Sequence, residues 1–227
     1  MRKYLFLLAI AMMIFTYLPA QTSQMLLKRL AEIVKQNNSD EALHLFRQLK
    51  AASLEQAMAF CLQQAQMSGN LQRALETEVI DTYKLRCDYA DAYAFCRKLL
   101  DNRPNDIELI CDCAELQFLG GHNLEAVALY ERVVNMDETH IEANIFLGGY
   151  HFLQGEKARR NLAADYLKLT SPTRMQQAAY RNEYILILST SYTKAKFYLR
   201  QVLRTSSSVE VMKILEKIEA AEKKIRK

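Results

Sequence analysis

The amino-acid sequence repeats a pattern of small and apolar residues at an interval of 34 residues. When the chain is shifted by this interval, several residues fall on identical ones and others fall on similar ones. A period of about 20–50 residues is typical of repeat proteins, in which each unit buries its apolar face against its neighbour. The identical pairs include Ala92 with Ala126, Ile107 with Ile141, Glu108 with Glu142, Phe118 with Phe152, Leu119 with Leu153 and Gly121 with Gly155.

The composition favours helices as the repeating elements. The 227 residues include only 6 Gly and 3 Pro, which strands joined by tight turns need in larger numbers. Apolar residues make up 50% of the chain, enough for a sizeable core. Capping patterns of the S/T-x-x-E/Q form begin at Ser53, Thr139 and Ser207. We therefore predict an all-α chain with about twelve helices, over 23–37, 40–50, 54–67, 71–86, 89–101, 105–119, 124–136, 140–153, 157–169, 173–189, 192–204 and 208–226.

One repeat, residues 107–140, has small residues where two antiparallel helices would approach closely. Ala114 lies in its first helix, Gly121 in its turn and Ala126 in its second helix, and the Tyr130 ring fills the space beside them. On these residues the chain resembles the tetratricopeptide repeat family. The resemblance implies a right-handed superhelix, or α-solenoid, of antiparallel helix pairs.

The neighbouring repeats match this pattern less completely. The repeat over residues 73–106 has the closing proline of the family, Pro104. The repeat over residues 107–140 lacks this proline. Residues 141–174 place Gly155 at the turn, and a weaker unit covers residues 175–207. Between residues 50 and 72 the array loses its phase, and the sequence leaves the helix pairing there open. The amphipathic helix at the C-terminus is expected to cap the last repeat.

The first twenty residues have the order of a secretory signal peptide. Arg2 and Lys3 precede an apolar run that ends at Ala20, and we expect cleavage there. The run of about fifteen residues is shorter than the roughly 20 that span a bilayer. The junction resembles that of envelope proteins of the Bacteroides group, which implies a periplasmic location in a Gram-negative cell. Because Leu18 is unfavourable three positions before the cut, an uncleaved inner-membrane anchor is the alternative. The repeat domain would then be residues 21–227.

The charged residues and histidines suggest no catalytic, metal or nucleic-acid site. The net charge is +4, and we expect no nucleic-acid partner because the basic residues are interleaved with acids. The four histidines form no metal-ligand motif, and no Gly-rich loop resembles a phosphate site. We therefore expect no cofactor, no metal and no enzymatic activity.

The five cysteines are predicted to be small buried apolar residues rather than disulfide partners. Cys111 and Cys113 lie two apart on a predicted helix, so their thiols point to different faces. An odd count leaves one cysteine over in any set of bridges. A bridge between Cys96 and Cys111, on neighbouring predicted helices, is the alternative.

The family resemblance also implies a concave face lined by the first helix of each repeat. Rings and charges there would suit a bound peptide or helix, although Phe118 and Phe152 could equally be core residues. We predict a non-catalytic protein-interaction scaffold. The alternatives are a membrane-anchored adaptor, a self-associating array and a hydrolase on a helical scaffold. The predicted peptide-binding residues are Asp81, Lys84, Glu115, Phe118, Phe152, Tyr180 and Tyr184.

Overall fold

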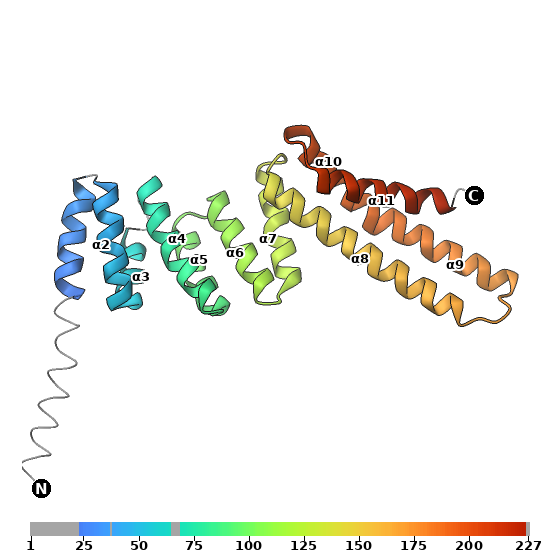
Figure 1. The fold of residues 1–227 in the computed structure, drawn as a ribbon, viewed down its shortest axis with the longest axis horizontal. Helices are drawn as coiled ribbons and strands as arrows, with labels where there is room; N and C mark the ends of the chain where they lie inside the picture. The colour runs from blue at the N-terminus through green and yellow to red at the C-terminus, as the bar shows by residue number, and fades with distance from the viewer. Residues whose placement is uncertain (1–22, 37, 65–68, 226–227) are drawn as a thin grey trace, which may run out of the picture. The chain divides into compact units, whose positions relative to one another are not determined.

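The computed structural model describes residues 23–36, 38–64 and 69–225 (Figure 1). This part of the chain is helical, with no strand, as the sequence predicts. No helix in it is long and apolar enough to cross a membrane. The predicted signal peptide, residues 1–20, lies outside the described residues.

The chain divides into two compact units, Met1–Gly121 and His122–Lys227, which we call the N-terminal unit and the C-terminal unit. The N-terminal unit begins with a helix over residues 23–35. Its further helices are α2 (Ser39–Ala52), α3 (Leu54–Gln63), α4 (Asn70–Leu85), α5 (Tyr89–Asn102) and α6 (Ile107–Leu119).

Small buried residues let the helices of the N-terminal unit approach one another. Ala42, Ala92 and Ala114 are completely buried, as the repeat pattern predicts. The rings of Phe46 in α2 and Phe60 in α3 pack against each other, with centroids 6.4 Å apart. Helix α3 fills the segment where the sequence loses its phase, and it packs against α2, α4 and α5.

Two turns of equivalent position end α4 and α6. Gly121 has a φ of +84° and lies 34 residues after Cys87, whose φ is +59°. This left-handed conformation lets the amide of Asp88 donate back to the carbonyl of Tyr83 at 3.0 Å. Glycine adopts it without strain, whereas a residue with a side chain is strained there. The turn after α4 is therefore equivalent to the turn after α6. The sequence does not indicate this, because Cys87 occupies the position of the glycine.

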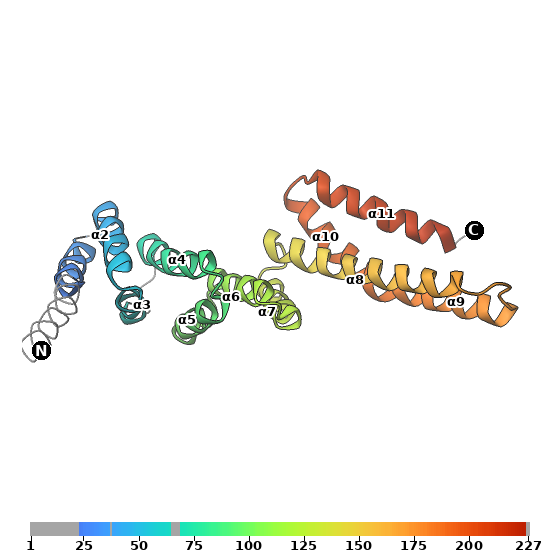
Figure 2. The same cartoon turned by 60° about the horizontal axis from the view of Figure 1, so that its bottom comes forward.

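The C-terminal unit is built around one long helix, α8 (Ile141–Leu167). Helix α7 (Asn123–Met136) packs against it, and α8 and α9 form a hairpin (Figures 1 and 2). The core joins Phe152 and Tyr192 to apolar residues of the last two helices. The remaining elements are α9 (Arg174–Ile187), a π-helical segment over Leu188–Tyr192, α10 (Thr193–Thr205) and α11 (Val209–Ile225).

The predicted turn at Gly155 is wrong. Helix α8 runs through this residue without a break, so the predicted helices 140–153 and 157–169 are one element. Gly155 is buried because the ring of Tyr192 lies against it: an added Cβ would lie 2.9 Å from that ring. Gly148 faces Leu199 in the same way, with a Cβ distance of 2.6 Å. The two glycines serve close helix packing rather than chain reversal.

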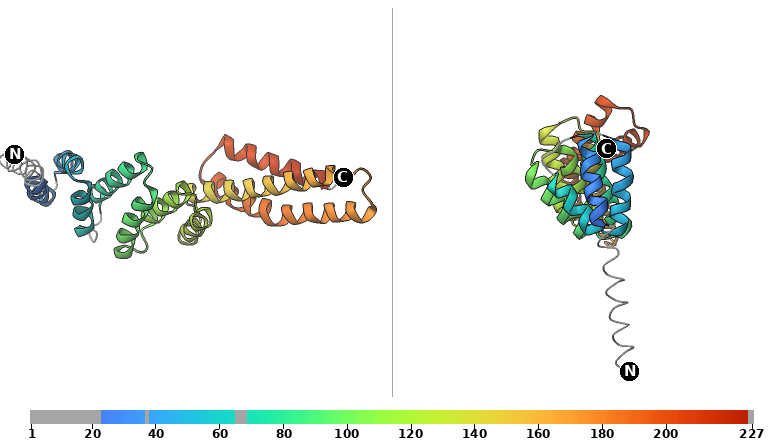
Figure 3. Two further views of the ribbon diagram at one scale, coloured as in Figure 1. Left: turned by 90° about the horizontal axis from the view of Figure 1, so that it is seen from below. Right: turned by 90° about the vertical axis from the view of Figure 1, so that its left-hand side faces the viewer.

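The predicted break between helices 173–189 and 192–204 is also wrong. The π-helical segment joins α9 to α10 directly, so helix continues from residue 174 to 205 (Figure 3). Side-chain hydroxyls bond the loosened carbonyls there, with Thr190 donating to the Leu186 carbonyl at 2.7 Å and Thr193 to Leu188 at 3.0 Å. The predicted helix pairs 141–174 and 175–207 are therefore replaced by one hairpin of long helices.

The helix starts agree in part with the predicted caps. Ser53 accepts from the amide of Gln56, as predicted. The other two starts lie one residue later than predicted, at His140 and Ser208. A capping box that the sequence analysis did not use joins Thr173 and Gln176 at the start of α9.

All five cysteines are free, and four of them are buried, in agreement with their predicted role. The alternative bridge between Cys96 and Cys111 does not form. Cys96 instead lies beside Cys113 of α6. A hydrogen bond between the two thiols, together with burial, raises the pKa of the Cys96 thiol. Cys87, in the turn after α4, is exposed.

Candidate protein-binding grooves

The N-terminal unit has a groove of about 580 Å³ along α4. Its walls combine charged side chains with small or short polar ones, and they come from helices α2, α4 and α6 and from the turn after α5. We call it the N-terminal groove. Its principal lining residues are Arg47, Arg73, Thr77, Glu78, Asp81, Arg103, Asp106 and Glu108.

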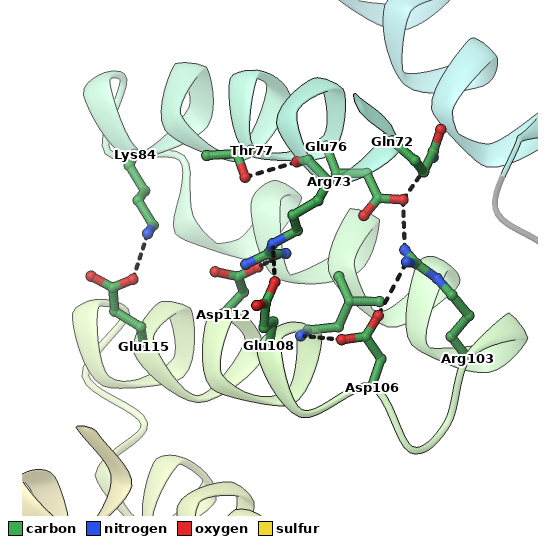
Figure 4. Close-up of polar contacts among 11 residues, drawn as sticks. Gln72, Arg73, Glu76, Thr77, Lys84, Arg103, Asp106, Glu108, Asp112 and Glu115 are labelled. Carbon is green, nitrogen blue, oxygen red and sulfur yellow. Dashed lines mark hydrogen bonds and ion pairs between the residues drawn. The ribbon is translucent and has the colours of Figure 1, made fainter. Parts of the chain in front are cut away.

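Arg73 joins the two sides of this groove (Figure 4). From α4 its guanidinium reaches two carboxylates of α6: Nη1 lies 2.5 Å from Asp112 and Nε lies 3.0 Å from Glu108. Burial raises the pKa of Asp112 above its usual value, even though the Arg73 cation opposes this effect. A planar guanidinium that contacts two acids is held in one orientation, so Arg73 is a fixed part of the groove wall.

Glu76, which lies on α4 as Arg73 does, is completely buried. Glu76 accepts from Arg103 at 2.6 Å and from Gln72 at 2.7 Å through the same oxygen. Arg103 also reaches Asp106 at 3.1 Å (Figure 4). Within the described residues, Glu76 Oε2 and Arg103 Nε have no hydrogen-bond partner. Removing one member of such a buried pair costs about 3–5 kcal/mol, so the network fixes the turn after α5 against α4.

A third set of charges joins α2 to α4. Glu78 binds Lys50 at 2.5 Å and Arg47 at 2.7 Å. Burial tends to raise the pKa of Glu78, but the hydrogen bonds from the two cations lower it below its usual value. Ion pairs thus link α4 to helices on both of its sides and leave the groove nearly neutral.

The predicted binding residues of the N-terminal unit have different surroundings. Asp81 is exposed, lines the N-terminal groove and makes no ion pair within the described residues. Lys84 and Glu115 bind each other, across α4 and α6 (Figure 4). Phe118 is 46% exposed, so it is not a core residue of the N-terminal unit.

The predicted residues of the C-terminal unit are mostly buried. Phe152 and Tyr184 are 8% and 4% exposed and line another groove. The hydroxyl of Tyr184 donates to the Ala221 carbonyl at 3.2 Å. Tyr180 is half-buried, and its ring packs on Tyr166 with centroids 4.4 Å apart. Phe152 is thus a core residue, which was the alternative that the sequence left open for it.

Searches among models of known protein families and among curated proteins find no match. Among solved structures, the chain matches the 2.19 Å crystal structure of a "putative protein binding protein" from Bacteroides ovatus. The two have a TM-score of 0.77 and 31% sequence identity, and the match covers 89% of this chain and 98% of that one. The two chains belong to one family. The Bacteroides ovatus relative also agrees with the predicted likeness to proteins of that group.

Several residues that shape these grooves are not among those predicted from the sequence. Arg73, Glu76 and Arg103 form the network in the N-terminal groove, but their partners lie 27 to 39 residues away in the sequence. The repeat period offered a usable signal, because positions about one period apart lie on adjacent helices. No group of three or more His, Cys, Asp or Glu side chains suited to a metal ion occurs within the described residues.

Proposed function

We propose that this chain is a non-catalytic scaffold that binds a protein or peptide partner in the N-terminal groove. The observation that carries the proposal is the fixed set of charged walls around Arg73, which leaves the Asp81 carboxylate exposed. Preformed polar walls lower the entropic cost of ordering a bound segment. The name of the Bacteroides ovatus relative supports a protein partner.

We further propose that the helix pairs of the N-terminal unit are tetratricopeptide-like and form a right-handed superhelix. The 34-residue period, the buried alanines and the equivalent turns at Cys87 and Gly121 support this assignment. In such an array the first helix of each pair lines the concave face, which is the role α4 would have here.

The proposed location is the periplasm of a Gram-negative cell, after cleavage behind Ala20. The charged, apolar and small-residue order of the first twenty residues supports it. An uncleaved anchor would hold the same scaffold at the inner membrane.

Site-specific crosslinking tests the proposal. A photoreactive residue replaces Asp81 in the groove or, as a matched control, Lys98, which is exposed on α5 outside it. Each tagged variant is expressed in a Bacteroides host, illuminated, purified and analysed by mass spectrometry. We expect one reproducible protein crosslinked at position 81 and absent at position 98, on a chain that begins at Gln21.

Equal crosslinking at both positions, or none at position 81, would reject the N-terminal groove as the binding site. A chain that keeps Met1 would favour the anchored form over the periplasmic one.

A further inference from the structure

The C-terminal unit contains a second groove, of about 380 Å³, between α8, α9 and α11. Its floor is apolar and its rims are basic, so we call it the cationic groove. Arg159 and Arg160 come from α8, and Lys217 and Lys224 come from α11. The apolar lining consists of Phe152, Leu153, Tyr184, Ala220 and Ala221.

Among the described residues, one acid lines the cationic groove, Glu156, and its neighbours already bind it. Glu156 Oε1 accepts from the Tyr192 hydroxyl at 2.5 Å, and Oε2 lies 2.8 Å from the Arg159 guanidinium. The hydrogen bond from Arg159 is the main reason that the pKa of Glu156 is lower than usual. Arg159 and Glu156 therefore largely cancel each other, and Arg160, which donates to the Glu156 carbonyl at 3.3 Å, lies beside the same residue. Within the described residues, Lys217 and Lys224 make no ion pair.

The sequence of α11 keeps its acids away from this groove. Lys217 has only Lys213, Ile214, Ala220 and Ala221 three or four positions away. Lys224 likewise follows Ala220 and Ala221 at these spacings. Because side chains three or four apart share a helix face, the groove-facing stripe of α11 is basic without acidic neighbours. Glu222 pairs with Lys196 of α10 at 2.8 Å, away from the groove.

The charge of the whole chain is concentrated in the same unit. Residues 122–227 contain 17 Lys and Arg against 12 Asp and Glu, a net charge of +5. Residues 1–121 contain 13 against 14, a net charge of −1. The mild total therefore hides an asymmetry that would attract an acidic partner to the C-terminal unit.

We infer that the cationic groove binds an acidic peptide segment of a partner protein, with an apolar side chain of that segment on its floor. Cations on facing rims repel each other, and carboxylates placed between them turn this repulsion into attraction. Leu153 is 61% exposed beside the floor, which a purely anionic ligand would leave uncovered. This inference rests on the proposed protein-binding function and names the chemistry of a second contact.

A peptide rather than nucleic acid fits the number of charges. Among the described residues, four cations line the groove, Arg159, Arg160, Lys217 and Lys224, and Arg159 is already paired with Glu156. Proteins that hold nucleic acid through its backbone commonly make about 6–10 phosphate contacts. An apolar floor adds little to phosphate binding but supplies a pocket for a leucine or phenylalanine anchor.

Fluorescence anisotropy with a labelled probe tests the inference on the full mature chain. The probe is a peptide of about twelve residues, Glu-Glu-Leu-Phe-Glu-Glu repeated twice, with blocked ends. We expect saturable binding that weakens about tenfold or more in the K217E/K224E double variant, which reverses both charges of the α11 rim. The K194E/K223E variant makes the same charge change at two exposed positions of α10 and α11 outside the groove, and we expect its affinity to stay within about twofold.

The apolar part of the inference has its own matched pair. Leu153→Ala should weaken binding several-fold, whereas Leu167→Ala, also exposed on α8 but outside the groove, should not. Thermal unfolding of each variant checks that the helices remain folded.

Three results would overturn the inference: equal weakening in both double variants, equal affinity for an all-glutamate peptide, or equal competition by a DNA oligonucleotide. None of them bears on the Asp81 crosslink, which reports on the N-terminal groove alone. Failure of this inference is therefore distinguishable from failure of the proposed function.

Discussion

Two glycines of α8 should respond in opposite ways to the same substitution. Replacing a helical glycine by alanine stabilises a helix by about 0.5–1 kcal/mol, because the unfolded chain loses conformational freedom. Gly149 has no atom within 4 Å of an added Cβ, so Gly149→Ala should show this full gain. Gly155 has the Tyr192 ring at 2.9 Å and the Cβ of Ser191 at 3.1 Å.

The methyl group added by Gly155→Ala would clash with the Tyr192 ring. Tyr192 is completely buried, and its hydroxyl is bound to Glu156, so the ring cannot swing aside. Overpacking of this kind costs about 1–3 kcal/mol. The free energies of unfolding of the two variants should differ by this strain, with Gly149→Ala more stable than the parent and Gly155→Ala less stable.

Urea denaturation followed by circular dichroism measures both values. For a chain of this size, 1 kcal/mol corresponds to about 2–4 °C in Tm, so thermal unfolding gives an independent check. If both variants gain stability equally, Tyr192 does not pack on Gly155, and the continuous course of α8 as described here would be refuted.

Two further substitutions test local features. Cys87→Gly should be more stable than Cys87→Ala by about 0.5–1 kcal/mol. Glycine removes a left-handed strain of about 1–2 kcal/mol, but it loses more conformational entropy on folding than alanine does. Equal urea midpoints for the two variants would argue against strain at this turn. Burial, and next the charge of Lys194, hold the pKa of His151 below its usual value of about 6.5, against the opposing Glu131. The unfolded chain then binds this proton more readily, so the stability that a neutral His151 contributes is present above about pH 6.5 and is lost as the pH falls through the folded-state value. His151→Phe, which keeps a ring against Tyr198, should flatten stability below that pH, and an unchanged pH profile would show that His151 does not titrate in this way.

The repeat pattern predicted the packing positions well. Ala92, Ala114 and Ala126 are fully buried, and Tyr130 is 3% exposed. These positions can be read from sequence because close helix approach admits only small side chains, whatever the neighbouring residues are. The all-helical class follows from the same pattern together with the scarcity of Gly and Pro.

The course of the C-terminal unit could not be read from the same pattern. Glycine serves both a left-handed turn at Gly121 and a close helix contact at Gly155, and the sequence does not distinguish these uses. The identity of the two residues across one period favoured a turn. Only the position of Tyr192, 37 residues later, shows that the second glycine packs against a ring.

The candidate sites were only partly predictable for a related reason. Lys84 and Glu115 were predicted as lining residues because both lie on first helices, and the structure brings them together as an ion pair. The excess of cations on the rims of the cationic groove depends on which face of α11 meets α8. Periodicity gives the faces of a helix but not the neighbour that each face meets.

Calorimetric titration of the partner crosslinked at position 81 into the purified chain tests the central claim, that this protein binds another protein without changing it chemically. We predict a saturable heat with a stoichiometric end point, and a partner whose mass is the same before and after the titration. A partner that is cleaved or modified by the chain, or a titration without saturable heat, would contradict the account.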